Sequence, residues 1–127
     1  MTELQNKKLV ALRPQISTEE AATTSEQFQN QTLRPILKLQ NELLIRVFRQ
    51  YITKHKNTFR KLSAPEKETY IKKSVRQDPH LRHFVRGIVV GHFTEPEWQE
   101  YSVNEEEMNK RMLNLIEQRL LSQLTEI

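Results

Sequence analysis

The sequence predicts an all-α protein, a single compact, irregular bundle of about five helices with a flexible N-terminal arm. The first observation is composition, because the 127 residues include only 2 Gly and many residues with high helix propensity. The second is a series of four proline or capping signals for helix starts within the 45 residues from Ser63 to Glu107. The third is that no segment alternates apolar and polar residues as a half-buried strand does.

Bulk composition places the chain among single-domain proteins of modest core size. The absence of Cys excludes disulfides, thiolate nucleophiles and Cys-ligated zinc. The N-terminal residues lack the apolar run of a secretory signal, and no stretch approaches the about 20 apolar residues of a membrane span. We therefore expect a cytoplasmic protein that does not enter a membrane.

The N-terminal residues differ in pattern from the rest of the chain. Residues 1–24 are weakly apolar and rich in Thr, Gln and Glu, and Pro14 interrupts them. We expect these residues to form a flexible arm with one short turn around Leu9–Leu12. Residues 25–127 are expected to form the helical bundle domain.

The first helix of the bundle is expected to be unusually long. Thr24 and Gln27 have capping-box spacing, and the helical pattern that they begin continues to about Lys61. Proline lacks a backbone N–H and crowds the preceding turn, so Pro35 is expected to divide or kink this helix.

The later helix starts are predicted from local sequence signals. These are side chains that can accept hydrogen bonds from the free backbone N–H groups of a first turn, and prolines that fit in that turn. We predict four helices from such signals. The first begins at Ser63–Glu66 and ends at about Arg76, and the second begins at Asp78-Pro79 and ends at about Gly91. A short third helix begins at Thr94–Glu97, and the last begins at Asn104–Glu107 and runs nearly to the end.

Projection of Leu33–Leu62 at a helical period separates an apolar face from a basic ridge. The apolar face is predicted to contain Leu33, Ile36, Leu37, Leu44, Val47, Phe48, Tyr51, Ile52, His55, Phe59 and Leu62. The ridge and the cations of the next two helices form a candidate basic interaction surface, made of Lys38, Arg46, Arg49, Lys56, Arg60, Arg76, Arg82 and Arg86. A solvated helix face without a binding role remains the alternative.

The helix from Pro79 changes character along its length. Its apolar side is expected to contain Leu81, Phe84, Val85 and Ile88, and the segment Gly87–Phe93 is apolar on all sides and expected to be buried. Gly87 and Gly91 lie four residues apart on one face, so we predict close packing of another helix there.

The last helix is apolar around much of its circumference, beyond a normal single stripe. Its apolar residues are Met108, Met112, Leu113, Leu115, Ile116, Leu120, Leu124 and Ile127. The helix either touches two neighbours or meets a second copy of the chain, so a homodimer is one expected assembly.

The histidines offer the strongest candidates for chemistry. His55 and His92 fall on apolar faces and are expected to be hydrogen-bonded core residues. His80 and His83 are three residues apart, but the arginines around them oppose a cation, and no Glu-x-x-His pair accompanies them. We therefore predict no metal site and no cofactor. Trp98 is expected to lie in the core with Tyr101, three residues away.

No catalytic motif is present, since the chain lacks a glycine-rich phosphate loop and a Gly-x-Ser-x-Gly elbow. No catalytic residue is predicted, and an enzyme that uses His80 or His83 in a pocket ranks third among the functional hypotheses.

Charge is distributed unevenly along the chain. Residues 34–86 contain 14 Lys/Arg against 4 Asp/Glu, whereas residues 87–127 contain 3 against 8. A basic middle joined to an acidic end favours an acidic partner or self-association. We therefore expect a non-enzymatic helical interaction module that self-associates and faces an acidic protein surface. A nucleic-acid-binding protein that uses the same cations is the alternative.

Two runs, Gln29–Leu44 (QNQTLRPILKLQNELL) and Gly87–Thr94 (GIVVGHFT), resemble a family of short, functionally uncharacterised all-helical bacterial proteins, some of which are labelled "glyoxalase". The label would imply a β-rich metalloenzyme with His and Glu ligands on strands. This sequence predicts neither strands nor such a ligand set, so we expect the label to be a misnomer and expect no glyoxalase activity.

Overall fold

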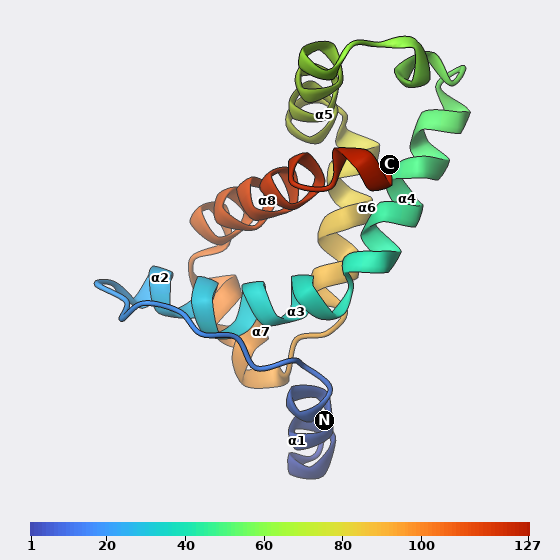
Figure 1. Ribbon diagram of the computed structural model, residues 1–127. Coiled ribbons are helices and arrows are strands. Elements are labelled where there is room, and N and C mark those ends of the chain that lie inside the picture. The colour runs from blue at the N-terminus through green and yellow to red at the C-terminus, as the bar shows by residue number, and fades with distance from the viewer.

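The computed structural model describes all 127 residues and contains helices but no strand, which confirms the all-α prediction. In Figure 1, α8 crosses the middle of the molecule, α4 and α6 run side by side, and α1 stands apart. The α-helices are α1 Glu3–Ala11, α2 Thr24–Phe28, α3 Arg34–Leu39, α4 Asn41–Lys54, α5 Ala64–Gln77, α6 Pro79–Val90, α7 Glu95–Val103 and α8 Glu105–Leu121. A π-helical segment, η1, spans Gln29–Leu33, and two 3₁₀ segments, η2 and η3, span Thr58–Lys61 and Leu124–Glu126. The predicted number of about five helices is therefore slightly low.

The long helix expected to run to about Lys61 is divided more than once. The π-helical segment η1 directly precedes α3 and widens the helix where the ring of Pro35 crowds the turn before it. A second, unpredicted break falls at Gln40, whose φ of −97° and ψ of 15° leave the helical region. α4 then ends at Lys54, because Lys56 and Asn57 are both left-handed, with φ of 63° and 58°, and a right-handed helix cannot continue through them.

Three of the four predicted later helix starts are confirmed by N-cap hydrogen bonds, at Ser63, Asp78 and Thr94. Each side-chain oxygen accepts from backbone N–H groups of the first turn that would otherwise lack a partner. Asn104 precedes α8 as predicted but makes no such bond, and its side-chain amide donates instead to Glu107 at 3.2 Å.

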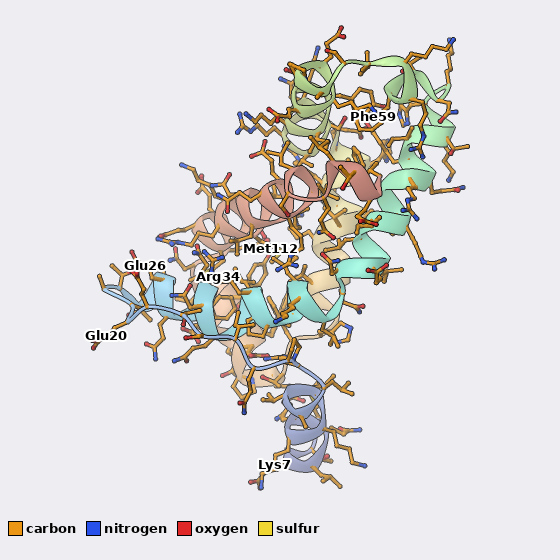
Figure 2. The ribbon with its side chains drawn as sticks, in the orientation of Figure 1. Lys7, Glu20, Glu26, Arg34, Phe59 and Met112 are labelled. Atoms are coloured by element: carbon orange, nitrogen blue, oxygen red, sulfur yellow. The ribbon has the colours of Figure 1, made fainter.

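α8 is the central helix of the fold. It packs against α4, α5, α6, α7 and η1, and Met112 lies among these elements (Figure 2). Its buried apolar residues are Met108, Met112, Leu115, Ile116 and Leu120. Neighbours within the chain therefore cover the wide apolar surface of this helix, which is the first of the two explanations that the sequence left open.

Most of the apolar face predicted in Leu33–Leu62 is buried. Its fully buried members are Leu33, Ile36, Leu37, Leu44, Phe48, Ile52 and Phe59. His55 is the exception, and its prediction as a core residue is wrong. It lies just beyond the end of α4, where the helical register that placed it on the apolar face no longer holds.

Two predicted core aromatics are also exposed. The side chain of Phe84 on α6 is 60% exposed, and that of Trp98 on α7 is 50% exposed. Tyr101 is buried as predicted, and the ring of Trp98 packs beside it with 5.4 Å between centroids. The buried stripe of each helix is therefore narrower than the apolar pattern of its sequence.

The predicted close packing at the glycines is not found. A Cβ atom added to Gly87 would meet no other atom within 4 Å, and one added to Gly91 would meet only Gly87 O at 3.1 Å and Ile88 O at 3.8 Å. Both glycines are exposed, so the segment Gly87–Phe93 is buried on one side only. The reason is that α6 turns only the Leu81, Val85 and Val89 stripe toward the core.

The N-terminal arm contains more helix than the single turn expected near Leu9–Leu12. Thr2 and Gln5 form a capping box at the start of α1, and the helix continues to Ala11 without burying any residue. The division into an arm of residues 1–24 and a bundle domain of residues 25–127 remains a prediction.

Candidate functional site

The basic interaction surface predicted from the sequence lies on α3 to α6 and the loop between α4 and η2. Its exposed members are Lys38, Arg46, Arg49, Lys56, Arg60 and Arg76, and its half-buried members are Arg82 and Arg86. The structure thus leaves most of the predicted cations in solvent.

One member of this surface forms an ion pair within the chain. Arg76 on α5 contacts Glu117 on α8, with 3.0 Å between Nε and Oε1. The Glu117 side chain is only 7% exposed, so the pair joins a buried carboxylate to an exposed guanidinium. No sequence signal predicts this contact between residues 41 positions apart.

Four further cations of the surface form hydrogen bonds to backbone oxygens or to a histidine ring. Arg49 and Arg60 donate to the backbone oxygens of Glu126 and Ile127. Arg82 donates to the backbone oxygen of Arg76 at 3.1 Å. The fourth is Arg86, whose Nη2 lies 2.7 Å from His83 Nδ1. These contacts orient the guanidinium groups, and none of them involves an Asp or Glu side chain.

The four histidines do not form a metal centre. His80 and His83 are both exposed, and no three His, Cys, Asp or Glu side chains in the chain gather at metal-binding distances. His92 is half-buried, and its Nε2 hydrogen-bonds with the side-chain amide of Gln40. His92 is therefore hydrogen-bonded as predicted, at the point where α3 meets the end of α6, but it is not the core residue that the sequence predicts.

A groove between α4 and α6 brings Tyr51 and Asp78, two groups with shifted pKa values, together with His55 and His80. We call it the α4–α6 groove; its volume is about 400 Å³, and it is lined by Val47, Gln50, Tyr51, Lys54, His55, Asp78, His80, Leu81 and Phe84. Tyr51 Oη donates to Asp78 Oδ2 at 2.7 Å, and His55 Nε2 lies 3.9 Å from the same oxygen. Asp78 Oδ1 accepts from the backbone N–H groups of His80 and Leu81 at 3.0 and 3.3 Å.

These contacts fix the protonation states in the groove. Burial, and then the hydrogen bond to Asp78, raises the pKa of Tyr51 to about 12. The hydrogen bond from Tyr51 is the largest cause that lowers the pKa of Asp78 below its ordinary 3.8. Near neutral pH the tyrosine therefore stays protonated and the aspartate stays ionised. Both oxygens of Asp78 accept hydrogen bonds within the fold, so this carboxylate caps α6 and secures α4.

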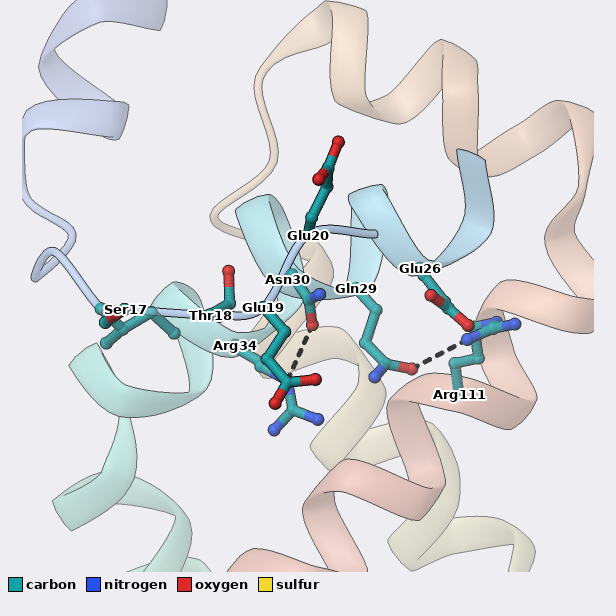
Figure 3. Close-up of a pocket in the computed structure, with 10 residues that line it drawn as sticks. Ser17, Thr18, Glu19, Glu20, Glu26, Gln29, Asn30, Arg34 and Arg111 are labelled. Atoms are coloured by element: carbon teal, nitrogen blue, oxygen red, sulfur yellow. Dashed lines mark hydrogen bonds between the residues drawn. The ribbon is translucent and has the colours of Figure 1, made fainter. Parts of the chain in front are cut away.

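A second hollow, the polar pocket of Figure 3, lies where the extended segment before α2 passes η1 and α8. Its volume is about 520 Å³, and its lining residues are Ile16, Ser17, Thr18, Glu19, Glu20, Glu26, Gln29, Asn30, Arg34 and Arg111. Asn30 Oδ1 accepts from Arg34 Nε at 3.0 Å, and Gln29 Oε1 accepts from Arg111 Nη1 at 3.1 Å. Carboxylates and guanidinium groups share its walls, so the pocket does not select a ligand of one charge. No motif in the sequence predicts it.

A buried polar network ties the N-terminal segment to α7. Arg13 forms a two-pronged pair with Glu97, at 2.6 Å from Nη1 to Oε2 and 2.7 Å from Nη2 to Oε1. Glu97 also accepts from the hydroxyl of Thr32 at 3.0 Å and from the backbone N–H of Thr94 at 2.8 Å. Burial alone would raise the pKa of Glu97, but the Arg13 and Thr94 hydrogen bonds and the Arg13 charge lower it below its ordinary 4.5.

In comparisons with known proteins, no protein-family model, no curated protein and no solved structure matches the chain. The resemblance to short helical bacterial proteins remains a prediction. None of the helices combines the length and the apolar character that crossing a bilayer demands. The cytoplasmic location likewise remains a prediction.

Proposed function

We propose that the protein is a non-enzymatic helical interaction module that associates with itself and binds an acidic protein surface through its basic interaction surface. One observation carries this proposal. Among the eight cations of that surface, only Arg76 lies within 4.0 Å of an Asp or Glu side-chain carboxylate of its own chain. Arg60 is turned toward the backbone oxygen of Ile127, and the remaining six present positive charge that a partner can neutralise. Such complementarity speeds encounter and sets orientation.

An acidic surface of the required kind is present on another copy of the chain. Glu100, Glu105 and Glu106 are exposed around the end of α7 and the start of α8, and no cation of the chain lies within 4.0 Å of them. The molecule thus has unpaired charge of both signs on different helices. Self-association pairs the two signs without any second protein species.

Sedimentation velocity over a concentration series tests this function. We expect the average mass to rise with concentration at about 50 mM salt and to rise much less at about 500 mM, because salt screens exposed charges. The double variant Arg46→Glu/Lys56→Glu should weaken association. Lys7→Glu/Lys8→Glu is the matched control, because it makes the same charge change at exposed positions on α1.

Two results would count against the proposal. A wild-type protein that stays monomeric at its highest soluble concentration and retains no protein in pull-downs would remove the interaction module altogether. Binding of labelled duplex or single-stranded oligonucleotides that falls by orders of magnitude between about 50 and about 200 mM salt would instead favour a nucleic-acid-binding protein.

A further inference from the structure

The α4–α6 groove is an apolar surface that the chain leaves uncovered. Val47, Leu81 and Phe84 supply its apolar walls, and Phe84 is 60% exposed. Scattered apolar residues on a surface are ordinary, but an aromatic ring that lines a groove of about 400 Å³ offers an anchor for a partner.

The most exposed charge at this groove is positive. Lys54 is exposed and lines the groove without a carboxylate of the chain within 4.0 Å, and the exposed side chains of His55 and His80 complete the rim. Asp78 is the only carboxylate in the lining; its side chain is 23% exposed, and its oxygens accept hydrogen bonds from Tyr51 and the first turn of α6. The groove therefore fits an apolar side chain that is flanked by carboxylates.

The turn between α7 and α8 presents such a side chain. Val103, the last residue of α7, is 89% exposed, more than any other large apolar residue of the chain. Glu100 lies one turn before it, and Glu105 and Glu106 follow two and three positions after it, all exposed and all unpaired within the chain. We call these four residues the α7–α8 corner.

We infer that the α4–α6 groove of one copy receives the α7–α8 corner of a second copy. Val103 contacts Phe84 and the apolar walls, while the carboxylates of the corner face Lys54 and accept hydrogen bonds from ring N–H groups of the two histidines. Self-association, proposed above, is the premise, and the groove and corner specify how it occurs. Because two different surfaces meet, the contact is head-to-tail, and it builds a ring if the rotation closes or an open chain if it does not.

Two complementary variants test this geometry. Phe84→Glu blocks the groove but keeps the corner, and Val103→Lys blocks the corner but keeps the groove. Both positions are exposed, so both variants should fold, which circular dichroism and thermal unfolding verify. By size-exclusion chromatography with light scattering, we expect each variant alone to lose affinity for itself by about tenfold or more. An equimolar mixture should form a 1:1 dimer, because one functional groove and one functional corner remain between the two chains.

The control is Val10→Glu, which places a charge on a 50% exposed residue of α1, outside both surfaces, and should associate as the wild type does. A wild-type monomer at all concentrations would overturn the self-association and the groove assignment together. If the wild type forms oligomers but the mixture of Phe84→Glu and Val103→Lys stays monomeric, only the head-to-tail assignment is overturned. Unchanged association of Phe84→Glu alone would show that the groove is not used.

Discussion

α8 and α1 are both regular α-helices of one chain, yet the structure holds them in opposite ways. α8 buries Met112 and Ile116 completely and touches helices from most of the chain. α1 buries no residue, and the segment that follows it is fixed by the side chain of Arg13, which is 5% exposed. Apolar burial therefore holds the central helix, whereas a polar network holds the N-terminal one, and each responds to a different perturbation.

The largest effect is expected from Met112→Ala. This side chain is fully buried in the middle of α8, so its truncation leaves a cavity among several helices. We expect the free energy of unfolding to fall by about 2–5 kcal/mol, measured by urea denaturation followed by circular dichroism. A loss below about 1 kcal/mol would show that neighbouring helices collapse into the space, and that α8 is less central than described.

A smaller, more local effect is expected from Arg13→Ala. The change leaves the partly buried carboxylate of Glu97 without its cation, which should cost about 1–3 kcal/mol. Amide hydrogen exchange should accelerate in α1 and the following segment while α8 keeps its protection. Arg13→Lys should restore only part of the stability, because an ammonium cannot make the two-pronged contact. Equal acceleration in both helices would show that the network supports the whole fold.

The same network should make stability depend on pH. Glu97 has a lower pKa in the folded protein than its ordinary 4.5, so its stabilising contribution is complete above that value. The contribution is lost as pH falls through the folded-state pKa. Thermal unfolding of wild type and Glu97→Gln from about pH 6 to about pH 3 should show a stability difference that shrinks at low pH. A difference that stays constant with pH would contradict this assignment.

The smallest effect is expected from Leu4→Ser on α1. The Leu4 side chain is 61% exposed and touches no core, so the free energy of unfolding should change by no more than about 0.5 kcal/mol. Urea denaturation of Leu4→Ser and Met112→Ala side by side measures the smallest and the largest expected change in the free energy of unfolding in one experiment. A large loss at Leu4 would reveal that α1 is covered in solution, for example by another copy.

The features that the sequence predicts correctly are those with local causes. Ser63, Asp78 and Thr94 bond to N–H groups within three residues, so their spacing alone locates the starts of α5, α6 and α7. The effect of Pro35 is equally local, because the disturbance falls in the turn just before it.

Features that depend on distant residues could not be predicted in this way. Arg13 and Glu97 are 84 positions apart, and nothing in either neighbourhood marks the other as its partner. Phe84 follows the apolar period of α6, but only three-dimensional packing decides that the stripe of Leu81, Val85 and Val89 faces the core. The lining of the α4–α6 groove likewise depends on how α4 lies beside α6, although its cations are evident from the sequence.

The half-exposed Trp98 gives the molecule an intrinsic optical reporter. It is the single tryptophan of the chain and lies on α7, five positions before Val103. Docking of the α7–α8 corner would change the surroundings of this indole or slow its tumbling, so emission wavelength and anisotropy would follow assembly without an attached dye. Its contact with Tyr101 and its position beside Glu97 make the same signal sensitive to loosening of α7. Assembly and local unfolding can thus be distinguished by their opposite spectral shifts, to the blue on burial and to the red on exposure.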